Sequence, residues 1–147
     1  MLPQRLRSFI ALPAAERRLA LRAIALLGCV RLALRTMPFR RLERWAAQPP
    51  KPGAHKVTGP DAVRRALIRA SRTLPGSTCL AQALVAQRLL GRGGVTAVLR
   101  IGVAAGNRAL GVREIEAHAW LEADGVVVTG AEEMARYAML TAFDQVR

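Results

Sequence analysis

The hydrophobic period of this chain changes near residue 95, and that change limits the folds open to it. Before it, apolar residues recur every three or four positions, as they do on one face of an α-helix. After it, they alternate with other residues, as they do along β-strands. Helices followed by strands that pair with their chain neighbours are typical of an α+β domain. We therefore predict an α+β fold in which helices precede an antiparallel sheet.

Proline, glycine and turn residues divide this pattern into elements. The expected helices are 14–35, 39–47 and 60–74, and a fourth helix is expected to be capped by Ser77 or Thr78 and to end at Gly91. The expected strands are 95–103, 114–123 and 126–128. Asp124-Gly125 predicts a two-residue hairpin turn, and the tail is expected to return to helix or loop, with core anchors at Tyr137, Leu140 and Phe143. We expect the chain to have two regions that form one compact unit. Residues 1–59 comprise helices and an exposed Pro/Gly linker, in which His55 is solvated, and residues 60–147 form the core.

Residues 19–34 are the most apolar stretch of the chain. Their longest uncharged run, Ala23 to Val30, is far shorter than the roughly 20 residues that cross a membrane. We expect a core-packed helix that buries Cys29 and leaves its apolar stripe incompletely covered. The alternative is peripheral contact with a membrane or a partner protein. The stripe is Leu19, Ala23, Leu27, Val30 and Leu34.

The charge and cysteine content exclude several classes of protein. Lys and Arg number 23 against 10 Asp and Glu, a net charge of +13, which predicts attraction to an anionic partner. Aromatic residues make up only 4%, which disfavours a base-stacking nucleic-acid platform. Two cysteines and two histidines, without a Cys-x-x-Cys, indicate neither a disulfide framework nor a metal site. We expect a cytoplasmic protein that needs no cofactor.

Cys79 is the strongest candidate nucleophile, because it stands at the predicted start of a helix. The unpaired N–H groups and positive dipole of a helix N-terminus favour the thiolate over the thiol. A base is also needed, and His118 is the one histidine outside the linker. A helix that packs its N-terminal end on the sheet would bring the two together. A third residue, from a neighbouring strand or turn, would orient the imidazole.

Three segments resemble the transglutaminase-like B2 proteins of lasso peptide biosynthesis. They are Leu74–Leu84 (LPGSTCLAQAL), Leu99–Val103 (LRIGV) and Glu116–Gly125 (EAHAWLEADG). The specific part is the pairing of Cys-Leu-x-x-Ala-Leu with Ala-His-Ala-Trp-x-Glu-x-x-Gly. The Arg/Leu-rich first helix is similar too, so the resemblance covers nearly the whole chain.

The resemblance implies a papain-like or transglutaminase-like core, with a catalytic helix packed on an antiparallel sheet. It implies a cysteine peptidase that removes the leader from a lasso peptide precursor, with Cys79 as nucleophile and His118 as general base. Gln82 is a candidate for the oxyanion site, but it could simply be a surface residue. Trp120 is a candidate for shielding the imidazole, and plain packing explains its position equally well. The implied partners are the precursor's leader, a separate small leader-recognition protein and an ATP-dependent cyclase.

The third catalytic residue is where this sequence departs from its relatives. Many of them carry an acidic residue twelve positions beyond the histidine, where this chain has Gly130, preceded by Thr129. Asp124 is one candidate for the third catalytic residue, although its ordinary role is to form the turn. Glu132 and Glu133 are the other candidates. Two other functions stay open: acyl transfer to an amine through the same thioester, and a non-catalytic basic module that binds an acidic peptide or nucleic acid.

Overall fold

The computed structural model describes residues 7, 9–49, 58–105, 115–131, 135 and 137–143. The elements are α2 (Ala14–Thr36), α3 (Phe39–Ala46), α4 (Pro60–Thr73), α5 (Cys79–Arg92), β1 (Ala97–Ala105), β2 (Ile115–Ala123), β3 (Val126–Thr129) and β4 (Ala138–Phe143). The predicted α+β class is therefore confirmed. His55 and most of the predicted Pro/Gly linker lie outside the described residues.

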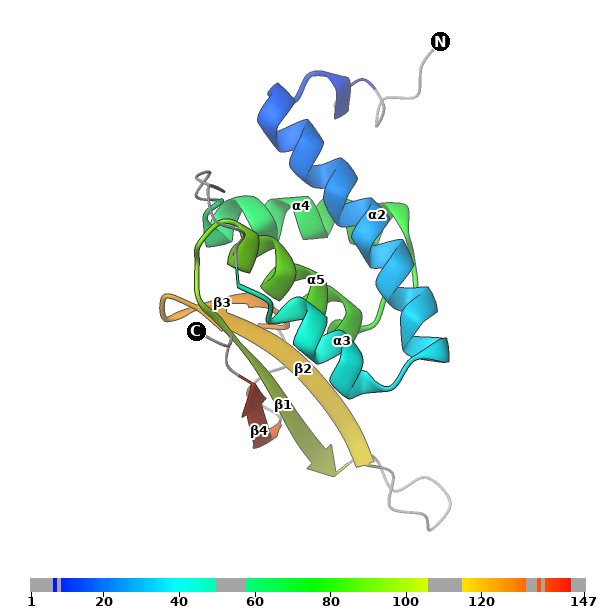
Figure 1. Ribbon diagram of the computed structural model, residues 1–147, viewed down its shortest axis with the longest axis vertical. Coiled ribbons are helices and arrows are strands. Elements are labelled where there is room, and N and C mark those ends of the chain that lie inside the picture. Colours follow the sequence, from blue (N-terminus) through cyan, green and yellow to red (C-terminus); the bar gives the residue numbers. More distant parts are fainter. Residues whose placement is uncertain are drawn as a thin grey trace.

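Helix α5 lies between the other helices and the sheet (Figure 1). It contacts α2, α3 and α4 on one side and β1, β2 and β3 on the other. Its sequence fits this position, because nine of its residues are buried and they lie on every side of the helix. A helix that is apolar all round is stable only when it is enclosed by other elements.

One hydrophobic core joins the N-terminal helices to the rest of the chain. Leu27 of α2 and Leu42 of α3 pack in the same cluster as Leu67, Leu84 and Leu99. Each of these side chains is at most 6% exposed. Burying a leucine side chain contributes about 1.5–3 kcal/mol, so both parts of the chain stabilise one core.

The sheet has four antiparallel strands in the order β3-β2-β1-β4. The predicted turn joins β2 to β3, and its two residues, Asp124 and Gly125, have φ values of 51° and 75°. Positive φ at both positions is what a type I′ hairpin requires, because this turn matches the twist of the strands it connects. The Asp-Gly hairpin prediction is confirmed.

The tail differs from the sequence-based expectation of helix or loop. Residues Ala138–Phe143 form β4, which pairs antiparallel with β1 at the edge of the sheet. β4 and β1 are far apart in the sequence, so no hairpin turn predicts that they pair. Tyr137 precedes this strand and is only half-buried, whereas the side chains of Leu140 and Phe143 lie outside the described part of the structure.

The apolar stripe of α2 is incompletely covered, as predicted. The centre of the predicted stripe is fully covered, with Ala23 and Leu27 at 0% exposure, and only the ends of the stripe are half-buried. The prediction of a core Cys29 is wrong. Cys29 lies two positions past Leu27, about 200° further round the helix, and its side chain is exposed there. Leu21 and Leu32 are also exposed, at 51% and 64%.

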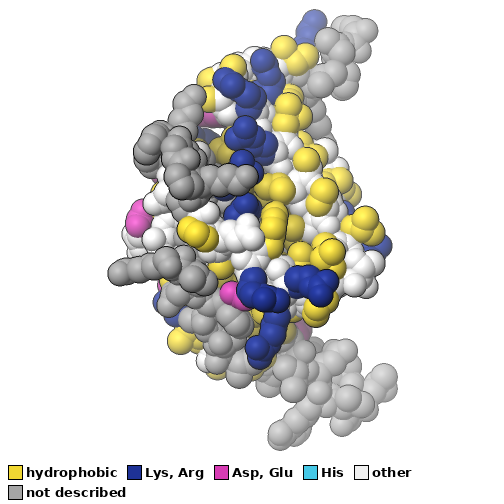
Figure 2. All heavy atoms as spheres, in the orientation of Figure 1, with side chains coloured by type: hydrophobic (Ala, Val, Ile, Leu, Met, Phe, Trp, Pro, Cys, Tyr) yellow, Lys and Arg dark blue, Asp and Glu magenta, His cyan; other side chains and the backbone are white. Residues whose placement is uncertain are grey.

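Figure 2 shows hydrophobic and arginine side chains side by side along α2. No helix among the described residues is long and apolar enough to cross a membrane. One face of α2 is buried in the core, and its exposed apolar side chains lie outside that buried face.

Thr78 caps α5 and so determines where this helix begins. Its side chain accepts a hydrogen bond from the backbone N–H of Ala81 at 3.2 Å. This contact satisfies one of the N–H groups that have no partner within the helix. Cys79 consequently occupies the first helical position.

We expect Thr78→Ala to lower the free energy of unfolding by about 1 kcal/mol, because it removes the cap. Thr78→Ser keeps the hydroxyl and is expected to retain most of that stability. Urea unfolding followed by circular dichroism measures both variants. Equal midpoints for Thr78→Ala and the wild type would contradict the capping role.

Candidate active site

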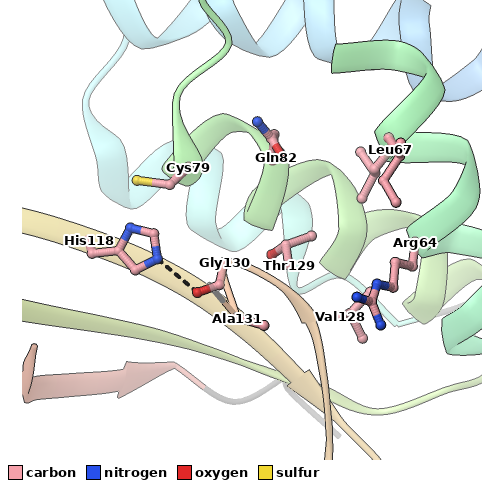
Figure 3. A pocket seen from close by; sticks show the side chains of 10 residues that line it. Arg64, Leu67, Cys79, Gln82, His118, Val128, Thr129, Gly130 and Ala131 are labelled. Carbon is pink, nitrogen blue, oxygen red and sulfur yellow. Dashed lines mark hydrogen bonds between the residues drawn. The ribbon is translucent and has the colours of Figure 1, made fainter. Parts of the chain in front are cut away.

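A pocket of about 300 Å³ opens where α4, the start of α5, β2 and β3 meet (Figure 3). Both candidate catalytic side chains line it. The lining residues are Arg64, Leu67, Ile68, Cys79, Gln82, His118, Val128, Thr129, Gly130 and Ala131. The structure thus brings Cys79 and His118 to one cavity from positions 39 residues apart in the sequence.

Cys79 stands at the rim of the helix layer, half-buried, with a free thiol. Figure 3 shows its sulfur extending toward the His118 ring. Because it is the first residue of α5, its sulfur lies beside the unpaired N–H groups at the positive end of that helix. A cysteine in this position, facing a histidine across a pocket, is a candidate nucleophile.

His118 lies in the middle of the sheet's second strand and is 9% exposed. Its Nε2 is 2.9 Å from the backbone carbonyl oxygen of Gly130. A carbonyl oxygen only accepts hydrogen bonds, so we assign the proton to Nε2, which donates. The other ring nitrogen, Nδ1, lies on the side of Cys79 (Figure 3).

Two aromatic rings stack on the imidazole of His118. The Tyr137 ring stacks on it with centroids 4.9 Å apart and an interplanar angle of 23°, and the Trp120 ring does so at 6.2 Å and 21°. Gly102 of β1 makes room for both rings, since a Cβ there would be 2.9 Å from Trp120 Cζ3 and from Tyr137 Cβ. Stacking restricts rotation of the imidazole and keeps water from its faces.

Trp120 is itself held by a charged network. Its Nε1–H donates to Glu122 Oε1 at 3.0 Å, and Arg100 Nε donates to Glu122 Oε2 at 2.7 Å. Burial alone would raise the pKa of Glu122, but the hydrogen bonds from Trp120 and Arg100 and the charge of Arg100 outweigh it and lower the pKa below 4.5. The carboxylate is therefore ionised at neutral pH and anchors the Trp120 ring beside His118.

The other predicted site residues are distributed less closely around the pocket. Gln82 lines it, and its Nε2 donates to the backbone oxygen of Ser77 at 3.3 Å. Asp124 is exposed in the β2–β3 turn and is not among the pocket-lining residues. Glu132 and Glu133 lie outside the described residues.

The sequence of this chain matches the model of a known protein family. The transglutaminase-like superfamily matches residues 16–142, which is most of the chain. The chain belongs to the transglutaminase-like superfamily. No curated protein and no solved structure matches it. This fold, in which a helix that starts with cysteine packs on an antiparallel sheet, is consistent with cysteine peptidase or acyltransferase activity.

Sequence reasoning missed three contributors to this transglutaminase-like site. The carbonyl of Gly130 is a main-chain group, so residue type does not reveal it. Tyr137 reaches the imidazole only because β4 pairs with β1. Arg64 is the one permanently charged side chain among the described lining residues, and it comes from α4, well before Cys79 in the sequence.

We expect Glu122→Gln to lower the free energy of unfolding at pH 7 by about 1 kcal/mol, because two hydrogen bonds to a carboxylate are weakened. The pKa of Glu122 is lowered in the folded state, so its stabilisation is present above pH 4.5 and is lost as pH falls below that value. Urea midpoints measured at pH 7 and pH 3 test this.

The difference between variant and wild type is expected to shrink at pH 3. Glu43→Gln on α3 is the control, since it removes one carboxylate that lies outside this network. A Glu122→Gln effect of the same size at both pH values would contradict the electrostatic explanation.

Proposed function

We propose that this protein is a cysteine peptidase that removes the leader from a lasso peptide precursor. The observation that carries the proposal is the shared pocket of Cys79, at a capped helix N-terminus, and His118, whose remote nitrogen is already hydrogen-bonded. The substrate class comes from the resemblance of the cysteine and histidine segments to lasso B2 proteins.

The proposed chemistry is acyl transfer through a thioester. The Cys79 thiolate attacks the scissile carbonyl carbon, and the carbonyl π electrons move onto the oxygen. His118 gives the proton on Nδ1 to the leaving amine as the carbon–nitrogen bond breaks. The backbone N–H of Cys79 is placed to stabilise the oxyanion, because it is an unpaired N–H at the start of α5. Water, deprotonated by His118, then hydrolyses the thioester.

The proposal includes partners and a setting. A small separate protein presents the leader, and an ATP-dependent cyclase closes the ring of the product. The setting is the cytoplasm, with the arginines and the outer face of α2 available for contact with an anionic surface. Acyl transfer to an amine would use the same thioester, so the nature of the acceptor is decided by product analysis.

We expect Cys79→Ala to abolish leader cleavage, because the covalent route needs the sulfur. His118→Ala is expected to reduce the rate about 100-fold to 10,000-fold, the usual contribution of a general acid–base group. Cleavage of the precursor, with the leader-binding protein present, is followed by mass spectrometry. Cys29→Ala is the matched control, since Cys29 is an exposed thiol on α2 away from the pocket.

Full cleavage by folded Cys79→Ala would refute the cysteine-peptidase proposal. No cleavage by the wild type, together with precursor binding that falls steeply with salt, would favour the non-catalytic basic binding module. An amide-linked product in place of free acid would indicate acyl transfer.

Asp124→Asn keeps the hairpin turn, because asparagine tolerates the left-handed conformation that Asp124 adopts. We expect this variant, Glu132→Gln and Glu133→Gln to retain measurable cleavage in the same assay. If Asp124→Asn is folded but as inactive as Cys79→Ala, Asp124 is the third catalytic residue.

A further inference from the structure

Among the residues that the structure describes, no acidic or amide side chain is hydrogen-bonded to the imidazole of His118, although histidine-dependent hydrolases ordinarily use such an orienting side chain. Among the described residues, the hydrogen-bond partner of its ring is the backbone oxygen of Gly130, 2.9 Å from Nε2. We propose that this carbonyl takes the place of the third catalytic side chain, and that Gly130 is the positioning residue of the site. The inference rests on the proposed function for its kinetic consequences, but its geometry can be tested without it.

The carbonyl selects one of the two neutral tautomers of the imidazole. Because the oxygen only accepts, the neutral ring must carry its proton on Nε2, which leaves Nδ1 free to accept on the side of Cys79. Nδ1 is the nitrogen that must take the thiol proton and later give it to the leaving amine. When the ring is fully protonated, Nε2–H still donates to the same oxygen, so the orientation is kept through both steps.

The backbone at residue 130 has a form that glycine adopts far more readily than other residues. Its φ is +78°, in the left-handed region. A Cβ at this position would be 2.9 Å from His118 Nε2, 2.8 Å from the Ala119 oxygen and 2.9 Å from Trp120 Cβ. Any side chain would therefore push the imidazole or the strand away.

The same contact explains why an acidic residue is missing here. The position twelve residues beyond the histidine cannot hold a carboxylate side chain and also keep its own carbonyl against Nε2. In this chain the backbone carbonyl of Gly130 lies close enough to Nε2 to orient the imidazole in place of a side chain. The exchange replaces a charged acceptor by a neutral one, which avoids burying a carboxylate beside the ring.

Gly130→Ala tests the proposal, and Gly125→Ala is its matched control. Gly125 has nearly the same conformation, φ +75°, on the other end of β3, but a Cβ there meets nothing within 4 Å. Both substitutions therefore introduce left-handed strain, and only Gly130→Ala crowds the imidazole. Thermal unfolding monitored by circular dichroism establishes that each variant is folded.

We expect Gly130→Ala to lower kcat at least about tenfold relative to Gly125→Ala, with KM within about twofold, because proton transfer rather than substrate binding is disturbed. Nitrogen-15 NMR of the histidine side chain, in a His55→Gln background, supplies a readout that a purely structural role would not change. The wild type and Gly125→Ala are expected to show the Nε2–H tautomer when neutral, and Gly130→Ala a mixture.

The proposal is overturned if neutral His118 of the wild type is the Nδ1–H tautomer, or if folded Gly130→Ala matches Gly125→Ala in kcat and tautomer. If Gly130→Ala does not fold, the wild-type tautomer decides alone. If the wild type cleaves no precursor, the proposed function fails separately. The positioning role is then judged from the tautomer and from iodoacetamide alkylation of Cys79 in a Cys29→Ser background, which Gly130→Ala is expected to slow relative to Gly125→Ala.

Discussion

The enclosure of α5 is the constraint on which the rest of this structure depends. This helix is buried on every side, between three helices and three strands, so it can neither rotate nor slide without opening the core. Its first residue is the cysteine, and the Thr78 cap fixes that residue at the end of the helix. The position of Cys79, the proposed nucleophile, is thus a consequence of hydrophobic packing some distance away from the pocket.

Close approach between α5 and the sheet depends on small side chains. Ala81, Ala83 and Ala86 on the helix and Ala119 and Ala123 on β2 are all at most 3% exposed. Alanine adds little thickness to either layer, so the backbone of the helix lies near the backbone of the strand. That proximity lets a short cysteine side chain and an imidazole from β2 share one pocket of about 300 Å³.

The site relies on neutral contacts where related chemistry often uses charge. Two stacked rings and one backbone carbonyl hold His118, and Glu122 acts one step further away, by fixing Trp120. Among the described lining residues the permanent charge is that of Arg64. The pocket therefore has a positive side chain at its edge in a chain whose net charge is +13.

Local patterns in the sequence determined most of the elements and pointed to Cys79 and His118 as the candidate pair. The change of period predicted α+β, and Asp124-Gly125 predicted the hairpin. A helix start capped by Ser77 or Thr78 made Cys79 the candidate nucleophile. Each of these patterns depends on the conformational preferences of a few adjacent residues. Tertiary packing decided the rest. It made the tail a strand, exposed Cys29, and set Tyr137 and the carbonyl of Gly130 against His118. These are contacts between segments distant in the chain, or contacts of the main chain itself, and residue type carries no local signal for either.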